Sequence, residues 1–267
     1  MKDILLLVHD DAGQEARLQV ALDIARAVRG HLHCVDVSLM PVLADCTYDG
    51  IGEALLLQDE RARESANKLQ LERRLGGEDV PWNWVDLTGS FASCLADAAA
   101  LVDLIVLNRK LDSFPYPDMR AAAREVLLRT GKPIVAVPDS VSRFPVNGRA
   151  LVAWDGSAPS AAALQAAVPL LRYASDVLLF EIDDGSIRTP AEEAAEYLAH
   201  HDIHAQIVRD FALRERVGEI LLVGVAIHGA DYVVMGAYSH LRVTEALFGG
   251  VSRCMLSKGP VPVFLAH

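Results

Sequence analysis

The chain has 267 residues, which allows one large domain or two of ordinary size. Hydrophobic residues make up 52% of it, enough for buried cores and too many for a disordered protein. The formal net charge is −11 without a basic block, and no apolar run approaches the ~20 residues that span a bilayer. We therefore expect neither a nucleic-acid partner nor a membrane partner.

The first predicted strand lies in MKDILLLVHDD. Its apolar part, residues 4–8, is shorter than the ~7–15-residue core of a signal peptide, and acidic residues follow at once. This start predicts a cytoplasmic protein. No two of the four cysteines have CxxC spacing, so we expect reduced thiols and no metal or redox centre. The cysteines are Cys34, Cys46, Cys94 and Cys254.

Further strands are predicted in the first half at residues 102–110 and 131–138, with helices between the strands. The same order of elements returns after residue 149: a strand, a small polar turn and a helix containing Leu-Gln, at residues 18–19 and again at 164–165. The chain is therefore predicted to be a tandem duplication. Pro145, Asn147 and Gly148 interrupt regular structure between the copies, so we expect domains at residues 1–140 and 148–267.

In the second half Ser157 is the expected N-cap of the first helix. Strands are predicted at residues 149–154, 175–182, 204–210, 231–237 and 261–267, and later helices at 190–201, 214–229 and 250–259. Strands that alternate with helices predict a doubly wound parallel sheet in each half. The terminal strand and its first-half counterpart, residues 131–138, are expected to join the halves as an internal pseudo-dimer or to support a homodimer.

Ligands of doubly wound sheets bind outside the carboxyl ends of the strands. Asp155 and the stretch MGAYSHLRVTEALFGGVSR, residues 235–253, both follow predicted strands. Glycines let a ligand approach the backbone, and N–H groups at a helix start attract phosphate. Two interpretations stay open, a phosphate-binding loop and a turn punctuated by glycines. The candidate site residues are Asp155, Gly236, Ser239, Gly249, Gly250, Val251 and Ser252, with His240 and Arg242 at the periphery.

These pieces together resemble the universal stress protein family in its tandem two-domain form, over nearly the whole chain. The resemblance implies Rossmann-like domains of the adenine nucleotide alpha hydrolase type. Members that bind ATP carry a loop of the form G-x2-G-x9-G-[S/T]. Here Gly236, Ser239, Gly249 and Gly250 occupy its four positions with the spacing intact, and Ser239 and Gly250 depart from the residue types.

The resemblance implies binding of ATP or a related adenine nucleotide, with or without Mg²⁺, in the second half. Asp155 would contact the adenine or ribose, and the loop the ribose and phosphates. The expected function is a stress-response sensor or switch with at most weak ATP hydrolysis and no catalytic residues. The alternatives are an interaction scaffold that has lost nucleotide binding in both halves and a slow ATPase. In relatives, the region that here begins at Leu39 covers the nucleotide cleft.

The first half lacks this loop. Asn108 and Leu111 stand where the motif has glycines, so we expect no ATP binding of the family type there, while His9 and Asp10 leave room for a different small ligand. Three histidines, His200, His201 and His204, lie near a helix end, where we expect solvated side chains and no metal.

Overall fold

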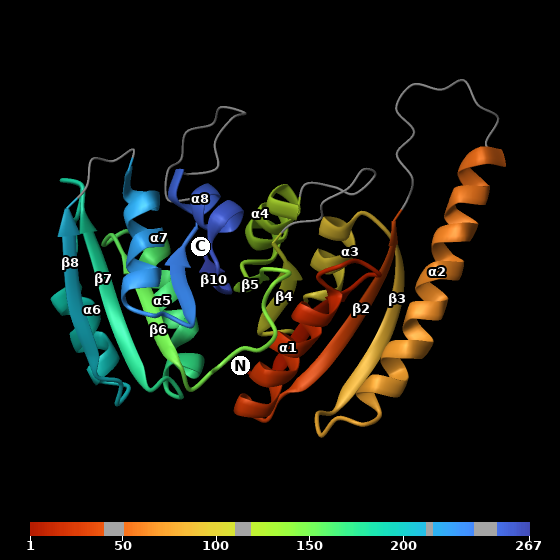
Figure 1. Cartoon of the computed structure of the whole chain (residues 1–267), viewed down its shortest axis with the longest axis horizontal. Helices are drawn as coiled ribbons and strands as arrows, with labels where there is room; N and C mark the ends of the chain where they lie inside the picture. Colours follow the sequence, from red (N-terminus) through yellow and green to blue (C-terminus); the bar gives the residue numbers. More distant parts are fainter. Residues whose placement is uncertain (40–50, 110–118, 212–215, 238–249) are drawn as a thin grey trace.

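The computed structural model describes residues 1–39, 51–109, 119–211, 216–237 and 250–267. Strands and helices alternate along the chain (Figure 1). The strands are β1 (Asp3–Val8), β2 (His31–Leu39), β3 (Trp82–Gly89), β4 (Leu104–Asn108), β5 (Ile134–Val137), β6 (Arg149–Trp154), β7 (Asp176–Asp183), β8 (Ala205–Phe211), β9 (Tyr232–Gly236) and β10 (Val263–Ala266). The helices are α1 (Gln14–Val28), α2 (Ile51–Leu75), α3 (Phe91–Ala98), α4 (Met119–Thr130), α5 (Ala158–Leu171), α6 (Ala191–Ala199), α7 (Val217–Ile227) and α8 (Gly250–Lys258).

The strands form one sheet of ten, in the order β3-β2-β1-β4-β5-β10-β9-β6-β7-β8. Reading inward from either edge gives the same order of elements, so the second half repeats the topology of the first. Neighbouring strands are parallel throughout, except that β5 and β10 are antiparallel. The predicted fold class, a doubly wound parallel sheet built twice, is confirmed.

Central strands such as β4 and β5 are buried at every position, because helices cover both faces of the sheet. One hydrophobic cluster joins the sheet to α1, α2, α5 and α6. A second cluster joins the opposite face to α3, α4, α7 and α8. Each half thus contributes the same pair of helical positions to each layer.

The two halves meet at β5 and β10, where Val263, Phe264 and Leu265 pair with Ala136, Val135 and Ile134. The prediction that these strands join the halves is confirmed. Each of them also pairs with a strand of its own half, so neither offers a free edge to a homodimer. The connection between the halves is held as well: the Phe144 N–H donates to Asp23 over 2.8 Å, and the Phe144 ring packs on Tyr232.

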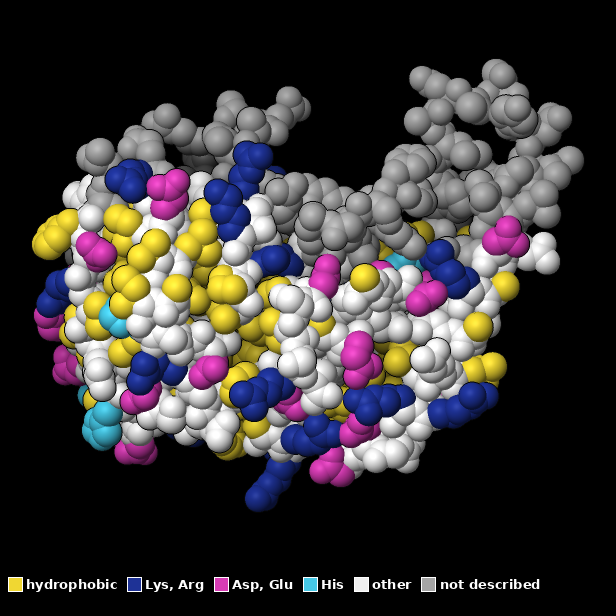
Figure 2. All heavy atoms as spheres, viewed as in Figure 1, with side chains coloured by type: hydrophobic (Ala, Val, Ile, Leu, Met, Phe, Trp, Pro, Cys, Tyr) yellow, Lys and Arg dark blue, Asp and Glu magenta, His cyan; other side chains and the backbone are white. Residues whose placement is uncertain are grey.

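The two halves differ in the helix that each presents on one face. Hydrophobic side chains gather over α7 in Figure 2, where Val223 is 54% exposed and Ile227 is 73% exposed. The equivalent helix of the first half, α3, instead turns Ser93 and Asp97 outward. The duplicated helices therefore share a packing role and differ in the surface they offer to solvent.

Candidate functional site

The strand register fixes which residues of the two halves are equivalent. The Asp103 N–H donates to the Asp3 carbonyl, and the Asp231 N–H donates to the Arg149 carbonyl in the same way. Counting along the strands from these pairs places His9, and not Asp10, at the position of Asp155. The same count places Asn108 at the position of Gly236. Asp10, which also follows a strand in the sequence, therefore lies one residue beyond the position of Asp155.

Asp155 is exposed at the carboxyl end of β6. One of its oxygens, Oδ1, accepts the Ser157 N–H over 3.0 Å, which closes a turn. Ser157 is the N-cap of α5, and its hydroxyl accepts the Ser160 N–H over 3.3 Å. The predicted cap is confirmed, and capping accounts for the Asp-Gly-Ser sequence without a nucleophilic serine.

The turn that carries Asp155 is fixed by its glycine. Gly156 has φ +67°, and a Cβ there would lie 2.5 Å from the Thr189 carbonyl oxygen. The Trp154 indole also donates to that oxygen over 2.8 Å. The connection after β7 therefore packs directly on this turn, so that Asp155 projects from a rigid base.

Gly236 has a structural reason to be glycine. A Cβ on it would lie 2.5 Å from the backbone carbon of Pro159 and 2.5 Å from the backbone nitrogen of Ser160. The end of β9 thus packs directly on the first turn of α5, which brings the start of the candidate loop beside the Asp155 turn. The sequence analysis assigned Gly236 a role in binding a ligand. The structure shows that a glycine is required at this position for packing against α5, with or without a ligand.

The far end of the candidate loop is the start of α8. Gly250 is exposed there, and a Cβ added to it would meet no atom of the described residues within 4 Å. Val251 is half-buried and Ser252 is 4% exposed. Of the other predicted site residues, Ser239, Gly249, His240 and Arg242 lie outside the described residues. The described part of the site is therefore an exposed carboxylate and an accessible helix start.

Replacing Ser157 by alanine tests the cap. The variant is expected to lose about 1 kcal/mol of unfolding free energy, because the Ser160 N–H loses its acceptor. Ser157→Asp, which keeps an acceptor at the helix start, should retain most of the wild-type value. Urea denaturation followed by circular dichroism measures both. If alanine and aspartate behaved alike, the role assigned to Ser157 would be wrong.

The equivalent edge of the first half is filled by its own side chains. His9 is fully buried, with Nδ1 2.8 Å from Oε1 of Glu64 on α2 and its ring 5.1 Å from the Phe91 ring. The Asp10 N–H donates to the same carboxylate over 3.2 Å. Asn108, at the position of Gly236, is also fully buried. The described side chains at this edge are therefore buried against one another, whereas Asp155 at the equivalent edge is exposed.

Sequence reasoning missed Glu64 and Asp36 at this edge. Asp36 on β2 is 3% exposed, and its carboxyl is hydrogen-bonded to Glu64. Burial, together with the negative charges of Glu64 and Asp86, raises the pKa of Asp36 to about 8. Burial acts on Glu64 in the same direction, but the hydrogen bond and charge of His9 outweigh it, so the pKa of Glu64 is lowered.

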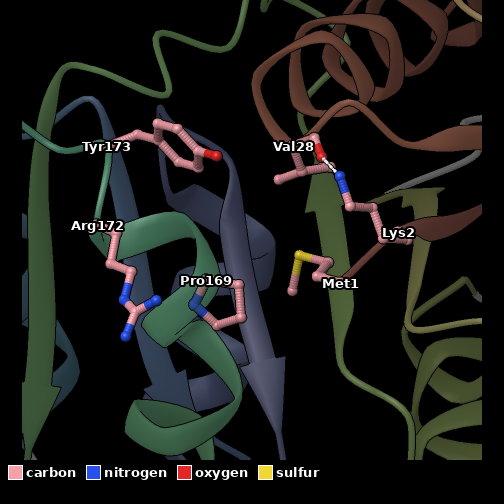
Figure 3. Close-up of a pocket in the computed structure, with 6 residues that line it drawn as sticks. All are labelled: Met1, Lys2, Val28, Pro169, Arg172 and Tyr173. Carbon is pink, nitrogen blue, oxygen red and sulfur yellow. Dashed lines mark hydrogen bonds between the residues drawn. The ribbon is translucent and has the colours of Figure 1, made fainter. Parts of the chain in front are cut away.

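A cavity of about 350 Å³ lies at the opposite end of the sheet (Figure 3). It is bounded by Lys2 and Val28 of the first half and by Pro169, Arg172 and Tyr173 of the second. Lys2 and Arg172 flank the amino ends of β1 and β7. Ligands of doubly wound sheets bind at the carboxyl ends, so this cavity is separate from the candidate site.

Within the described ranges, no helix is both long and apolar enough to cross a membrane. In the same ranges, no three His, Cys, Asp or Glu side chains are grouped so as to hold a metal ion. At the end of α6, His201 packs its ring on Tyr197.

Comparison with known proteins identifies the fold. No protein-family model and no curated protein sequence matches the chain. A universal stress protein from Archaeoglobus fulgidus superposes over 99% of this chain and 97% of its own, with a TM-score of 0.75 and 15% identity. Two Pseudomonas aeruginosa proteins, one provisionally assigned as a universal stress protein and one of unknown function, each superpose over 100% of this chain and at least 92% of their own, at TM-score 0.63 and 16% identity. The chain has the fold of these proteins over its full length.

Proposed function

We propose that the chain is a tandem universal stress protein whose second half binds an adenine nucleotide as a sensor or switch in the cytoplasm. The fold shared with a full-length universal stress protein supports the family. The nucleotide is supported by the difference between the two strand ends. Beside β6 the described residues offer an exposed Asp155 and an exposed helix start at Gly250, whereas beside β1 the equivalent edge is filled by buried His9 and Asn108.

Asp155 would bind a hydroxyl or amino group of the nucleoside, because its described hydrogen bond uses Oδ1 and its side chain faces solvent. The phosphates would bind at the start of α8, where the N–H groups of Gly250 and Val251 are at the positive end of the helix dipole. Gly236, Ser239 and Gly249 would shape the loop between these two points, with His240 and Arg242 at its rim. Any accompanying Mg²⁺ would be held chiefly by the phosphates.

Titration with ATP, ADP and AMP, each with and without Mg²⁺, tests the proposal. We expect heat of binding by calorimetry and a higher melting temperature, because a ligand held only by the folded chain stabilises it by about 2.7 kcal/mol at a hundredfold excess over Kd. Gly249→Val should abolish the shift while leaving the melting temperature of the free protein near the wild-type value. No heat and no stabilisation by any of the three at millimolar concentration would contradict the proposal.

Gly250→Ser is the matched gain-of-function variant. The space at Gly250 accepts a side chain, and the serine restores the hydroxyl of the family motif. We expect tighter nucleotide binding in this variant. A scaffold role is the second candidate, favoured by the exposed Val223 and Ile227 on α7. It is supported if neither wild type nor Gly250→Ser binds nucleotide.

A further inference from the structure

Two buried carboxyl groups meet in the first half, away from the candidate nucleotide site. Asp36 on β2 is 3% exposed and Glu64 on α2 is 2% exposed, and within the described residues Asp36 Oδ1 has no hydrogen-bond partner. Burial, with the charge and hydrogen bond of Glu64, raises the pKa of Asp36. An ionised carboxylate has only acceptor atoms. A hydrogen bond between two carboxyl groups therefore requires a proton on one of them. Asp36 and Glu64 are called the carboxyl pair below.

The pair also joins α2 to the strand end of β1. Glu64 accepts hydrogen bonds from the Asp10 N–H and, over 3.3 Å, from the Asn67 amide, and it contacts His9. One turn further along α2, Asn67 exchanges two amide hydrogen bonds with Gln14 of α1. The polar attachment of α2 is thus centred on Glu64.

The charged groups around the pair do not neutralise Asp36. Lys68 is engaged by Asp86, with Nζ 2.6 Å from the carboxylate, and Arg63 lies 3.9 Å from Glu64. Neither forms an ion pair with Asp36 within the part of the chain that the structure describes. The titratable or charged groups at this edge are His9, Asp10 and Asp11 after β1, Arg17 on α1, Asp86 on β3, and Arg61, Arg63 and Lys68 on α2.

The second half supplies an internal control. Val8 pairs with Asp36, and the equivalent Trp154 pairs with Glu181, so an acid occupies the same sheet position in both halves. Glu181 is also buried, but its cross-strand neighbour is Arg209, whose Nε lies 2.6 Å from the carboxylate. In the first half that neighbour is Asp86. An arginine neutralises the acid in one half, and in the other a proton has to do so.

We propose that the proton held between Asp36 and Glu64 fastens α2 to the sheet, and that losing it at alkaline pH releases the helix. Without the proton, two buried carboxylates face each other beside Asp86, and they become favourable only when α2 moves away and admits water. Release would uncover His9 and the Asp10 N–H at the strand end of β1. The first half would then present a proton-controlled edge that is independent of any nucleotide in the second half.

The pH window follows from the raised pKa of Asp36. In the released state the pKa of Asp36 returns to its ordinary range. Between that ordinary pKa and about pH 8, the docked state therefore holds one more proton than the released state. Docking is strongest below the ordinary pKa of Asp36 and weakens as pH rises towards about 8, with the release constant rising by up to about tenfold per pH unit. The pKa of Glu64 is lowered, so its effect on docking has the opposite dependence on pH: it stabilises the docked state above the ordinary pKa of Glu64 and is lost only on acidification.

Hydrogen exchange of the full chain as a function of pH tests the proposal. After correction for the intrinsic exchange rate, protection of α2 amides should fall by up to about tenfold per pH unit between about pH 5 and about pH 8. Helix α6, the equivalent helix of the second half, should show no such slope. Asp36→Asn, which donates a hydrogen bond without a titrating proton, should flatten the slope in α2.

A second variant keeps the test decisive if Asp36→Asn does not fold. Asp86→Arg places in the first half the residue that the second half carries at this position, and the cation should neutralise ionised Asp36. Protection of α2 should then become independent of pH, whereas Asp86→Asn should retain a slope. The proposal is overturned if the α2 slope persists in Asp36→Asn or in Asp86→Arg, or if α6 shows the same slope as α2.

Discussion

Replacing Arg17 by methionine is expected to lower the free energy of unfolding by about 3–5 kcal/mol, the cost of leaving one partner of a buried ion pair alone. Arg17 is fully buried, and its Nη2 lies 2.7 Å from Asp11, whose side chain is 7% exposed. The same guanidinium donates to the carbonyls of Leu7 and His9. Methionine keeps the apolar stem but removes the guanidinium donor from both carbonyls, and among the described donors it leaves Asp11 only the Gly13 N–H.

The second half shows how the loss can be partly recovered. It carries Ala163 and Ser157 at the positions of Arg17 and Asp11, so that turn holds without an ion pair. Adding Asp11→Ser to Arg17→Met removes the uncompensated carboxylate and should recover about 1–3 kcal/mol. Chemical denaturation of both variants gives the two values. A loss below about 1 kcal/mol in Arg17→Met would show that the pair has no such role.

Gly236→Ala is expected to destabilise the fold by about 1–3 kcal/mol, whether or not nucleotide is present. The added Cβ would lie 2.5 Å from backbone atoms of Pro159 and Ser160, and these can yield only if the first turn of α5 shifts. Gly250→Ala is the matched control. Its Cβ meets no atom within 4 Å among the residues that the structure describes, so its effect should stay within about 0.5 kcal/mol.

Thermal unfolding of the two variants without nucleotide separates the roles of the two glycines. Equal losses in both would contradict the packing explanation for Gly236. If the expected difference is found, packing within the fold explains Gly236. Gly250, which stands at the Ser/Thr position of the motif, has no packing role of this kind, so any effect of replacing it on nucleotide binding would report on the ligand site. Loss of nucleotide binding in Gly236→Ala would then be uninformative about direct contact, whereas a change in Gly250→Ala would report on the site itself.

Local patterns were enough to place the elements of the second half. The apolar run at residues 149–154 coincides with β6, and Ser157 caps α5 as its position before a helical stretch predicts. Buried parallel strands and capped helices are encoded within a few consecutive residues, which explains this success. The doubly wound parallel fold of each half followed from the alternation of strands and helices and from the duplication.

The filled edge of the first half could not be predicted in this way. Glu64 lies 54 residues from Asp10, in a helix rich in charged residues, and nothing local marks which of its acids turns inward. The packing role of Gly236 also arises from a distant contact, with α5. Such features depend on contacts between elements that are distant in the sequence. The signal that could have pointed to the carboxyl pair is a comparison of the two halves position by position, which shows Asp86 at the position equivalent to Arg209.

The antiparallel pairing of β5 with β10 also governs how the protein is made. β5 is complete early in translation, but the ribosome has to add nearly all of the second half before β10 exists to cover it. Every residue of β5 is buried in the finished sheet, so until then the nascent chain carries an open, apolar strand edge. We therefore expect the chain to be most prone to aggregation in the interval before the halves join, and products truncated within the second half to aggregate through β5.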